Sequence, residues 1–487
     1  MVSLLTISAA SRSAETNVIE LSLSEAIRLA LEHNLDIQIE RVGPEIARYQ
    51  LQLAYAPYDP LFDFSAVHSY SASPGGTDEQ NRRFAGTKTD RDAFSTGLQG
   101  ILPSGLTYNL TGDLSRRTGT DPSGDFATSS GQAGIALRQP LLKNLWIDRT
   151  RLDIRLSKNQ VKSSEFALRL RMMEIMNSVE LTYYGLILAR ENVKVQEQAL
   201  QLAERLVKDN EKRVQVEALA ELDAKQSLSQ LEVRRSDLLV AQRNVLLQEN
   251  ALKGLLADNY GNWPNTTIVP METLVAVPSQ FDLRASWERG LEKRPDVLQA
   301  RVAVENTGLV GKFYHNQLFP QLDLVGSYGR TGLGDGYSGA LAGIRDGDTP
   351  FYSYGAVVTL PLTMRAARSN YKITKAEQKR AVLTLKGVEQ RVMQDIEDAI
   401  RVADTSFRRV ATTKQATLFA QEALDGEQKK LDSGKTTTFV VLQLQRDLTA
   451  ARSAEVQALA EYNRALSQLA FQEGTTLERH KVNLEIE

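Results

Sequence analysis

The chain has 487 residues, a formal net charge of −2, and an ordinary content of 42% hydrophobic and 24% charged residues. A nucleic-acid-binding protein would show a basic balance or a basic face, so this class is excluded. The chain contains no cysteine, which excludes a disulfide framework, a thiol nucleophile, a cysteine zinc site and a lipidated cysteine. No stretch reaches about 18 consecutive apolar residues, so a membrane-spanning part has to be built from strands.

Residues 1–20 precede the first recognisable element. After Met1 the segment begins VSLLTISAASRSAET, a short apolar run followed by small residues, like the end of a secretory signal. It lacks a basic start, and its apolar core is short. The sequence therefore predicts either a truncated signal remnant or a disordered tail.

The first repeat, residues 21–257, begins with a predicted helix from Leu21 to Ala54, which Ser24 is expected to cap. Asp59-Pro60 breaks the helical pattern, and the period then changes to two. This alternation predicts four strands, at residues 61–71, 92–102, 105–116 and 129–139. Long polar connections, residues 72–91 and 117–128, join the outer pairs of strands, and a tight Pro103-Ser104-Gly105 turn joins the middle pair.

The longest pattern runs from Trp146 to Leu256 without a proline, and its apolar residues recur at three- and four-residue steps. Its phase slips at Val214–Leu222, which predicts a turn between two helical arms. The first arm has roughly 68 residues and spans ~100 Å, and the second is about half as long. A stripe left bare on the long arm therefore has to be covered by another part of the chain.

The same layout returns after a proline-rich linker, residues 258–282. The second repeat, residues 283–473, holds a helix over 283–318, strands over 321–330 and 351–360, and a hairpin over 364–472 that turns at 432–438. Residues 474–487 form a C-terminal tail. A shift of 260 positions aligns identical residues of the two halves without a gap: Leu23, Leu31, Glu32, Asp36, Arg41, Val42, Glu45, Pro60 and Asp63 fall on Leu283, Leu291, Glu292, Asp296, Arg301, Val302, Glu305, Pro320 and Asp323.

The lengths of the helices predict how each repeat is completed. The helix before the strands and the short arm have about 35 residues each, and end to end they match one long arm. One chain thus supplies four helical columns and four to six strands, whereas the smallest membrane barrels have eight strands. We therefore expect the chain to oligomerise in order to cover its edges.

Three segments carry a family resemblance: LSLSEAIRLALEHN at the start, LEKRPDVLQARVAVE followed by LFPQLDLVGSYG in the middle, and the G-x-x-x-x-x-V-L-x-x-Q form of Gly434–Gln445. Together they resemble the TolC family of outer-membrane efflux proteins over about Leu21 to Leu469. The resemblance implies a mixed, mainly α fold with very long antiparallel helical hairpins that form a tunnel, and strands that contribute to a shared transmembrane β-barrel. It also implies a homotrimer in the outer membrane, extending into the periplasm, that meets a periplasmic adaptor protein and an inner-membrane pump or ABC transporter.

The resemblance also assigns roles to the two hairpin turns. Periplasmic gate and tip residues are expected at Asp223, Leu431, Asp432, Lys435 and Gln443. Adaptor contacts are expected at Ala220, Leu222, Gly434 and Thr437. The family places two acids, three residues apart, at the second tip, but Val440 and Gln443 stand at these positions here, which predicts a gate with fewer charges.

Aromatic residues in the strands suit a band that contacts outer-membrane lipid, with a soluble sandwich core as the alternative. They are Phe62, Phe64, Tyr70, Tyr108, Tyr328, Phe351, Tyr352 and Tyr354. Family members usually give two strands per repeat, so the four strands of the first repeat predict a wider barrel of eighteen strands per trimer. The additional hairpin could instead fold into the lumen or stand above the membrane.

No pattern in the sequence predicts catalysis or a cofactor. The four histidines lack metal-ligand spacing, and the glycines of residues 332–336 fit an extracellular loop better than a phosphate-binding loop. Asp346-Gly347-Asp348 fits a solvated turn or a cation site. A passive export duct is therefore the main prediction. An enzyme on a helical scaffold and a structural coiled-coil spacer or adhesin are the alternatives.

Overall fold

The computed structural model describes residues 17–77, 79–121, 123–217, 220–263, 265–347 and 349–482. Most of the predicted signal remnant, residues 1–16, lies outside this range. The chain folds into two compact units: Met1–Pro44, Ser163–Ala300 and Leu385–Glu487 form the first, and Glu45–Lys162 and Arg301–Thr384 the second. Among the described residues, none of the helices combines the length and apolar character needed to span a bilayer.

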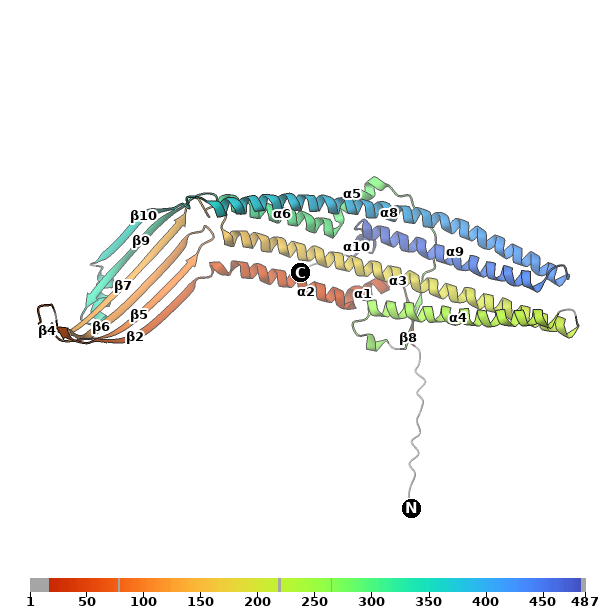
Figure 1. Cartoon of the computed structure of the whole chain (residues 1–487), viewed down its shortest axis with the longest axis horizontal. Helices are drawn as coiled ribbons and strands as arrows, with labels where there is room; N and C mark the ends of the chain where they lie inside the picture. Colours follow the sequence, from red (N-terminus) through yellow and green to blue (C-terminus); the bar gives the residue numbers. More distant parts are fainter. Residues whose placement is uncertain are drawn as a thin grey trace, which may run out of the picture. The chain divides into compact units, whose positions relative to one another are not determined.

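Each half begins with two helices, whereas the sequence predicted one (Figure 1). In the first half, α1 (Leu23–His33) and α2 (Leu35–Tyr55) are separated by Asn34. The Asn34 side chain accepts hydrogen bonds from the backbone N–H groups of Asp36 and Ile37, and so caps the second helix while it ends the first. The cap of α1 is Ser22 rather than the predicted Ser24, since the Ser22 hydroxyl accepts from the Glu25 N–H.

The second half breaks at the equivalent position, where Arg294 separates α5 (Leu283–Lys293) from α6 (Pro295–Asn316). Proline at the first position of a helix disfavours helical geometry in the preceding residue, which explains the break. Arg294 lies 260 positions after Asn34, and the first strands of the two halves, which start at Leu61 and Gln321, differ by the same number. The shift of 260 positions that aligns identical residues therefore also relates the helix breaks and the first strands of the two halves.

Both long hairpins form as the sequence predicted. The first consists of α3 (Arg149–Gln215) and α4 (Glu221–Leu256), and the second of α8 (Arg365–Asp432) and α9 (Thr438–Gln472). A short helix, α10 (Thr476–Arg479), follows the second hairpin. Two short strands that the sequence did not reveal, β1 (Asn17–Leu21) and β8 (Thr266–Pro270), pair in parallel. The remaining short pieces are η1 (Ala56–Tyr58) and η2 (Tyr260–Asn262).

The largest hydrophobic core of the first unit gathers around α3. Tyr183, Met176 and Leu186 on this helix are fully buried and pack with Ile27 of α1 and Leu252 of α4. The Tyr183 hydroxyl donates a hydrogen bond to the Leu21 carbonyl, 2.8 Å away. Because α1 and α4 both cover α3, the bare stripe expected on the long arm is covered within the same chain.

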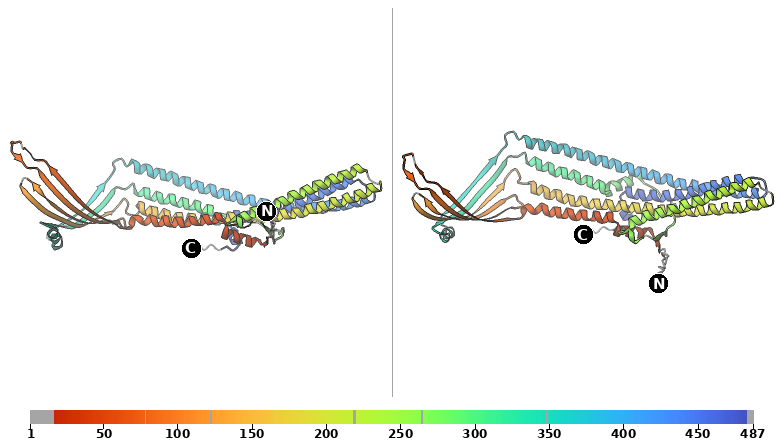
Figure 2. Two further views of the ribbon diagram at one scale, coloured as in Figure 1. Left: turned by 90° about the horizontal axis from the view of Figure 1, so that it is seen from below. Right: turned by 60° about the horizontal axis from the view of Figure 1, so that its bottom comes forward.

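Six strands of the second unit form one curved antiparallel sheet (Figure 2) whose spatial order follows the chain order. The first repeat supplies the first four strands and the second repeat the last two. They are β2 (Leu61–Ser73), β5 (Thr87–Ile101), β6 (Thr107–Asp121), β7 (Gly124–Pro140), β9 (Gln321–Gly334) and β10 (Pro350–Thr359). Strands β2 and β10 are the two edges of this sheet.

Two connections differ from the sequence-based expectation. Residues 117–128 are not a long loop, because β6 and β7 remain paired up to Asp121 and Gly124 and leave a tight turn. The glycine-rich segment after β9 is not an irregular loop either, since it contains α7 (Tyr337–Asp346). The connection between β2 and β5 is long, as predicted, and holds the two-residue strands β3 (Gly76–Thr77) and β4 (Arg83–Phe84).

Candidate functional site

The six-stranded sheet has one apolar and one polar face. In an antiparallel register, directly opposed residues share a face, so the pairing of Phe94 with Ala66 and with Leu114 places all three on one side. Following this register across the sheet gives an apolar face that includes Phe62, Phe64, Tyr70, Leu98, Tyr108, Leu110, Ile135, Leu137, Leu324, Tyr328, Tyr352, Tyr354 and Val358. Such a face suits contact with lipid.

Seven of the eight predicted band residues lie on this apolar face, but Phe351 does not. Phe351 pairs with Gly329, and both residues point to the polar side. The absence of a side chain at Gly329 leaves room for the Phe351 ring, because a Cβ there would lie 2.3 Å from it. The inclusion of Phe351 in the lipid-facing band was therefore wrong, since strand residues one position apart face opposite ways.

The polar face carries hydroxyl and amide groups together with paired charges. Cross-strand serine pairs form at Ser65–Ser95, Ser115–Ser130 and Ser327–Ser353, with oxygen–oxygen distances of 2.7, 3.0 and 2.8 Å. Arg138 Nε donates to the buried Asp323 carboxylate at 2.7 Å, and Gln321 donates to the same oxygen at 2.8 Å. This surface is suited to contact with water.

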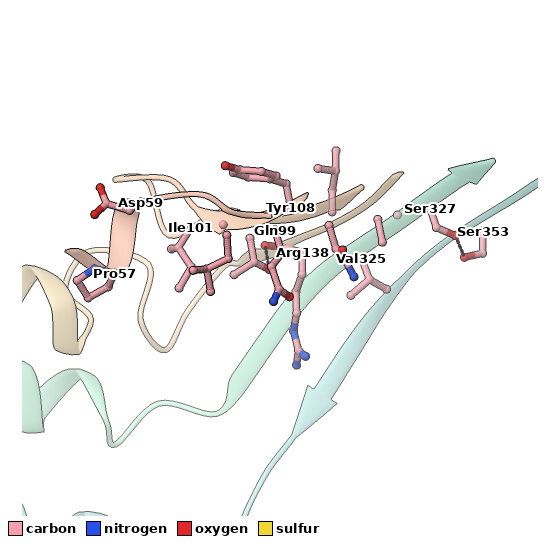
Figure 3. A pocket seen from close by; sticks show the side chains of 16 residues that line it. Pro57, Asp59, Gln99, Ile101, Tyr108, Arg138, Val325, Ser327 and Ser353 are labelled. Atoms are coloured by element: carbon pink, nitrogen blue, oxygen red, sulfur yellow. Dashed lines mark hydrogen bonds between the residues drawn. The ribbon is translucent and has the colours of Figure 1, made fainter. Parts of the chain in front are cut away.

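A hollow of about 520 Å³ lies against the polar face where the strands approach the helices (Figure 3). Its lining includes Pro57, Gln99, Arg138, Ser327 and Ser353. These groups come from several strands and from the turn before β2. Together with Ile101, Leu137 and Val325 they form an open wall that mixes polar and apolar groups.

The first hairpin tip presents three of the predicted residues. Ala220 is the exposed N-cap of α4, and Leu222 in the first turn exposes 70% of its surface. Asp223 is half-buried in the same turn, where a carboxylate is favoured by the helix dipole. Val216 is also strongly exposed. The tip therefore combines apolar side chains with the half-buried Asp223 and the exposed acids Glu217 and Glu221.

The second tip presents the other predicted residues around a tight turn. Gly434 adopts a left-handed φ of 69°, which ends α8 and allows the chain to reverse. Lys435 and the N-cap residue Thr437 are exposed. Phe439 and Val440 beside them are also exposed hydrophobic residues.

Leu431 and Asp432 have different surroundings, although they are adjacent. Leu431 exposes only 4% of its surface and packs in a core with Leu206 of α3 and Val441 of α9. Asp432 accepts a hydrogen bond from Arg213 of α3 at 3.1 Å, and Arg213 also donates to the Leu431 carbonyl. Leu431 thus contributes to the packing between the two hairpins, and Arg213 is a tip residue that sequence reasoning missed.

Gln443, at a position where the family has an acid, lies one turn into α9. Its amide donates to Asp447 at 3.0 Å and its carbonyl oxygen accepts from Arg446 at 2.7 Å. The second tip therefore offers a neutral, hydrogen-bonded side chain at the position where the resemblance implies an acid.

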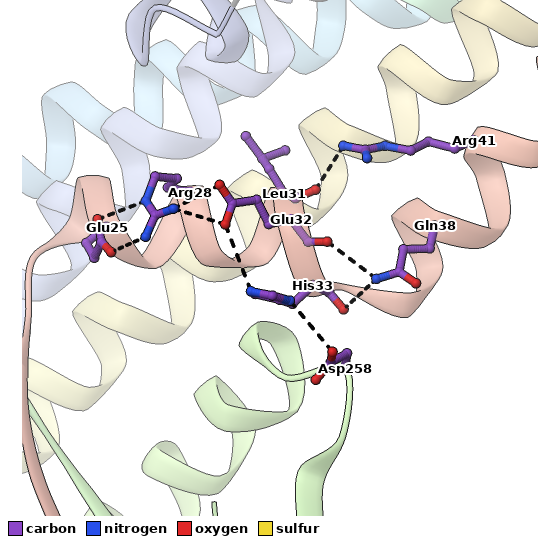
Figure 4. A network of polar contacts seen from close by, with 8 residues as sticks. All are labelled: Glu25, Arg28, Leu31, Glu32, His33, Gln38, Arg41 and Asp258. Carbon is purple, nitrogen blue, oxygen red and sulfur yellow. Dashed lines mark hydrogen bonds and ion pairs between the residues drawn. The ribbon is translucent and has the colours of Figure 1, made fainter. Parts of the chain in front are cut away.

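Two polar networks fix the ends of the helical segments in the first unit. At the break between α1 and α2, Arg28 bridges Glu25 and Glu32, and His33 lies 3.7 Å from Asp258 (Figure 4). Near the C-terminus, the buried Glu180 of α3 is hydrogen-bonded to His480 and lies 3.7 Å from Arg479. Burial alone would raise the pKa of Glu180, but its hydrogen bonds to His480 and Ser467 and the charge of Arg479 outweigh it and lower that pKa.

The histidines have structural surroundings. His33, His68 and His480 lie beside carboxylates, and His315 lies between the rings of Phe319 and Tyr371. Within the described residues, no group of three or more His, Cys, Asp and Glu side chains is arranged to hold a metal ion. Of the proposed cation turn, Asp346 pairs with Arg345, and Asp348 lies outside the described residues.

Comparison with known proteins agrees with this geometry. Residues 284–475 match the family model described as outer membrane efflux protein. The outer membrane efflux protein BepC of Brucella suis is 25% identical over 366 residues, which cover 74% of this chain and 75% of BepC. Outer membrane protein OprJ of Pseudomonas aeruginosa is 24% identical over 348 residues, covering 70% of each protein.

Solved structures share the fold. The Campylobacter jejuni CmeC outer membrane channel superposes with a TM-score of 0.65 at 19% identity, covering 93% of this chain and 86% of that one. The outer-membrane channel OprN gives a TM-score of 0.67 at 16% identity, covering 93% and 90%. The long hairpins joined to an antiparallel sheet are thus the fold that these solved channel structures share.

The resemblance predicted from the sequence is confirmed. The family model matches the second half of the chain, and the relatives that cover about three quarters of it are outer-membrane efflux proteins. These likenesses support an outer-membrane efflux channel that extends into the periplasm.

Proposed function

We propose that three copies of this chain form a passive duct whose outer section is an eighteen-stranded barrel, with six strands from each copy. The observation that carries this proposal is the single six-stranded sheet, with unpaired edges at β2 and β10 and one apolar face. An exposed strand edge has to be covered, and closure into a ring removes both edges at once.

The strand directions support closure between identical copies. Neighbouring strands alternate in direction through all six positions, so β10 of one copy runs antiparallel to β2 of the next. Head-to-tail contact of this kind uses two different edges and generates a closed ring when the rotation fits. A hairpin that stood above the membrane or folded into the lumen would leave the sheet, whereas β5 and β6 pair along most of their length with their neighbours.

Helix α2 carries a second surface suited to another copy. Six apolar residues recur at alternating steps of four and three, the spacing of a helix–helix seam, and each exposes between 47% and 71% of its surface. They are Leu35, Ile39, Val42, Ile46, Tyr49 and Leu53. Because the opposite side of α2 packs within the chain through Ile37 and Ala47, this stripe is available to a neighbouring subunit.

The trimer is tested by Leu53→Asp, because a charge placed in a buried helix seam costs several kcal/mol when it has no partner. We expect the variant to fold but to lose the trimer in native mass spectrometry and in unheated gel electrophoresis. Gln52→Asp is the matched control, since Gln52 is an exposed polar neighbour on the same turn. An intact trimer with Leu53→Asp would contradict the proposed seam.

The hairpin tips are proposed to dock a periplasmic adaptor protein, which joins the duct to an inner-membrane pump or ABC transporter. The exposed apolar side chains Val216, Leu222, Phe439 and Val440 support end-on contact. Ala220→Asp or Thr437→Asp should abolish export and adaptor capture while the trimer persists, because an unpaired charge would be buried in the contact. Export at the unmodified level by both variants would contradict docking at the tips.

The duct is proposed to act without catalysis, and its cargo is set by the pump. The relatives include one named for pyoverdine export and one named for cation efflux, so chemically different cargoes use similar channels. The open polar wall of the sheet, with its serine pairs and the paired Arg138, fits this passive role.

A further inference from the structure

The short helix α7 is seated on the apolar face of the sheet through glycines. A Cβ at Gly332 of β9 would lie 1.9 Å from the Ala340 carbonyl oxygen, and a Cβ at Gly343 would lie 2.8 Å from the Gly332 Cα. Gly334 and Gly339 approach each other in the same way, with 2.8 Å from the Gly334 Cβ position to the Gly339 Cα. Backbone contact this close requires glycine, so the position of α7 is specified by the sequence.

The contacts of α7 also identify the face. A Cβ at Gly131 of β7 would meet Ile344 of the helix at 2.8 Å and Leu114 of the apolar face at 3.3 Å. Tyr337, the first residue of α7, packs edge-on against Phe94, with ring centroids 6.0 Å apart. Figure 2 shows this helix, drawn in teal between β9 and β10, on the convex side of the curved sheet. Helix α7 therefore lies on the side opposite the polar wall.

Helix α7 lies over the part of this face where the side chains change from apolar to polar and charged. One row across the strands reads Ala66, Phe94, Leu114, Gly131 and Gly332. The next row on the same face, two residues toward the β9–β10 connection, is polar and charged, and reads His68, Asp92, Arg116, Ser129 and Gly334. Helix α7 contacts glycines of both rows, so it sits where apolar side chains give way to charged ones.

The outward side of α7 combines an apolar and a basic residue. Leu341 exposes 52% of its surface, and the side chain of Arg345, four residues further on, exposes 79%. The Arg330 side chain beneath the helix donates to the Arg345 carbonyl at 3.2 Å, and the Arg116 guanidinium lies 5.9 Å from the centre of the Tyr337 ring. Arg116 and Arg330 of the strands and Arg345 of the helix itself thus lie at this level, and the Nε of Arg345 also pairs with Asp346.

We propose that α7 is an interfacial anchor that lies in the headgroup layer of the outer leaflet and binds anionic, phosphate-bearing lipid there. Leu341 reaches the boundary of the acyl chains, while Arg345 extends along the surface to a phosphate, as long basic side chains do at membrane interfaces. The apolar face below the helix and the charged row above it bracket a single layer, and anionic headgroups complement the arginines. This inference rests on the proposed lipid-facing role of the apolar face.

Fluorescence quenching in vesicles of stated composition tests the anchor. Because the chain has no cysteine, single cysteines at Leu341, Leu110 and Thr111 take one polarity-sensitive fluorophore each in the assembled full-length protein. The trimers are reconstituted with nitroxide lipids labelled either at the headgroup or in mid-chain. We expect Leu341→Cys to be quenched most by the headgroup nitroxide, Leu110→Cys by the mid-chain nitroxide, and Thr111→Cys only by an aqueous quencher.

The outcomes separate the anchor from the proposed function. If the Leu110 probe is quenched by lipid and the Leu341 probe is not, the anchor is overturned and the lipid-facing sheet stands. If lipid quenches neither probe, both proposals are overturned. A Leu341 probe quenched more strongly in mid-chain than at the headgroup also overturns placement in the headgroup layer.

Two substitutions isolate the features that the inference uses. Arg345→Gln should abolish the rise in headgroup quenching at Leu341 that we expect when phosphatidylglycerol is added to phosphatidylcholine vesicles. Gly332→Val should displace α7 and lower that quenching, whereas Gly355→Val should not, since a Cβ at Gly355 meets no atom within 4 Å. An unchanged lipid response in Arg345→Gln would overturn phosphate binding by this arginine.

Discussion

The two halves of the chain agree in their helices and differ in their strands. Helices α3 and α8 have 67 and 68 residues, and α4 and α9 have 36 and 35. In contrast, the first half supplies four strands to the sheet and the second half two. The two halves therefore share one helical layout and differ by one β-hairpin.

The physical reason lies in how each element tolerates insertions. Residues added to one arm of a helical hairpin rotate its apolar stripe away from the partner helix, because the period is 3.6 residues. A whole hairpin added to an antiparallel sheet preserves the direction of every neighbour and the alternation of faces. Strands β5 and β6 show this, since β2 and β7 on either side of them keep the directions that the sheet requires.

The largest expected effect comes from the helical core of the first half. Tyr183 is fully buried, and the position in α8 that lies equally far from the start of its helix is Ala399. Tyr183→Ala should destabilise the protein by roughly 3–5 kcal/mol through the cavity and the lost hydrogen bond to Leu21. Denaturant unfolding followed by circular dichroism of the helices measures the free energy of unfolding, and Ala399→Gly serves as the comparison in the second half. If Tyr183→Ala lowers this free energy no more than Ala399→Gly does, this view of the core is contradicted.

The second comparison concerns the charges of the two tips. Asp223 in the first tip has no acidic counterpart at Val440 and Gln443 in the second. Asp223→Asn should reduce cation selectivity and divalent block, whereas Val440→Asp with Gln443→Asp should increase both, because acids close to the pore axis attract cations. Planar-bilayer recordings measure both quantities. Strong divalent block that survives Asp223→Asn would show that the closing charge lies elsewhere.

A smaller effect is expected at the buried carboxylate of α3. The pKa of Glu180 is lowered below its ordinary value of 4.5 in the folded protein. A carboxyl with a lowered folded pKa stabilises the fold above its unfolded pKa, and this contribution is lost as the pH falls through the folded pKa. Below about pH 4.5, the Tm of the unmodified protein should therefore fall more steeply with decreasing pH than the Tm of Glu180→Gln. Parallel pH profiles of the two proteins would contradict a role for this group.

The sequence predicted the parts of the fold that depend on local periodicity. The hairpin arms, their turns and the six strands follow from residue spacing, and the structure reproduces them within a few residues at most ends. The break at Asn34 was missed because its cause is a side chain that caps α2 and also donates to the Leu255 carbonyl, a contact 221 residues away. The break at Arg294 could have been predicted, since Pro295 follows it directly.

Features set by distant contacts were not predictable in the same way. Leu431 looked like a tip residue because it precedes the turn, but packing against α3 and α9 decides its burial. Helix α7 was missed because its glycines are typical of a loop. Their role is to let the helix pack closely on the sheet, where Gly332 and Gly334 of β9 lie opposite Gly339 and Gly343. The position of Phe351 was an avoidable error, because the two-residue period already separates it from Tyr352 and Tyr354.

The central claim is that the additional β5–β6 hairpin belongs to the barrel wall, and single-cysteine labelling of β6 tests it most directly. Each variant would be treated as an assembled trimer in the outer membrane with a membrane-impermeant thiol reagent. On the wall model, cysteines at Thr107, Asn109 and Thr111 react because they face the water-filled pore, while those at Tyr108 and Leu110 are protected by lipid. Uniform labelling from Thr107 to Thr111 would contradict the account.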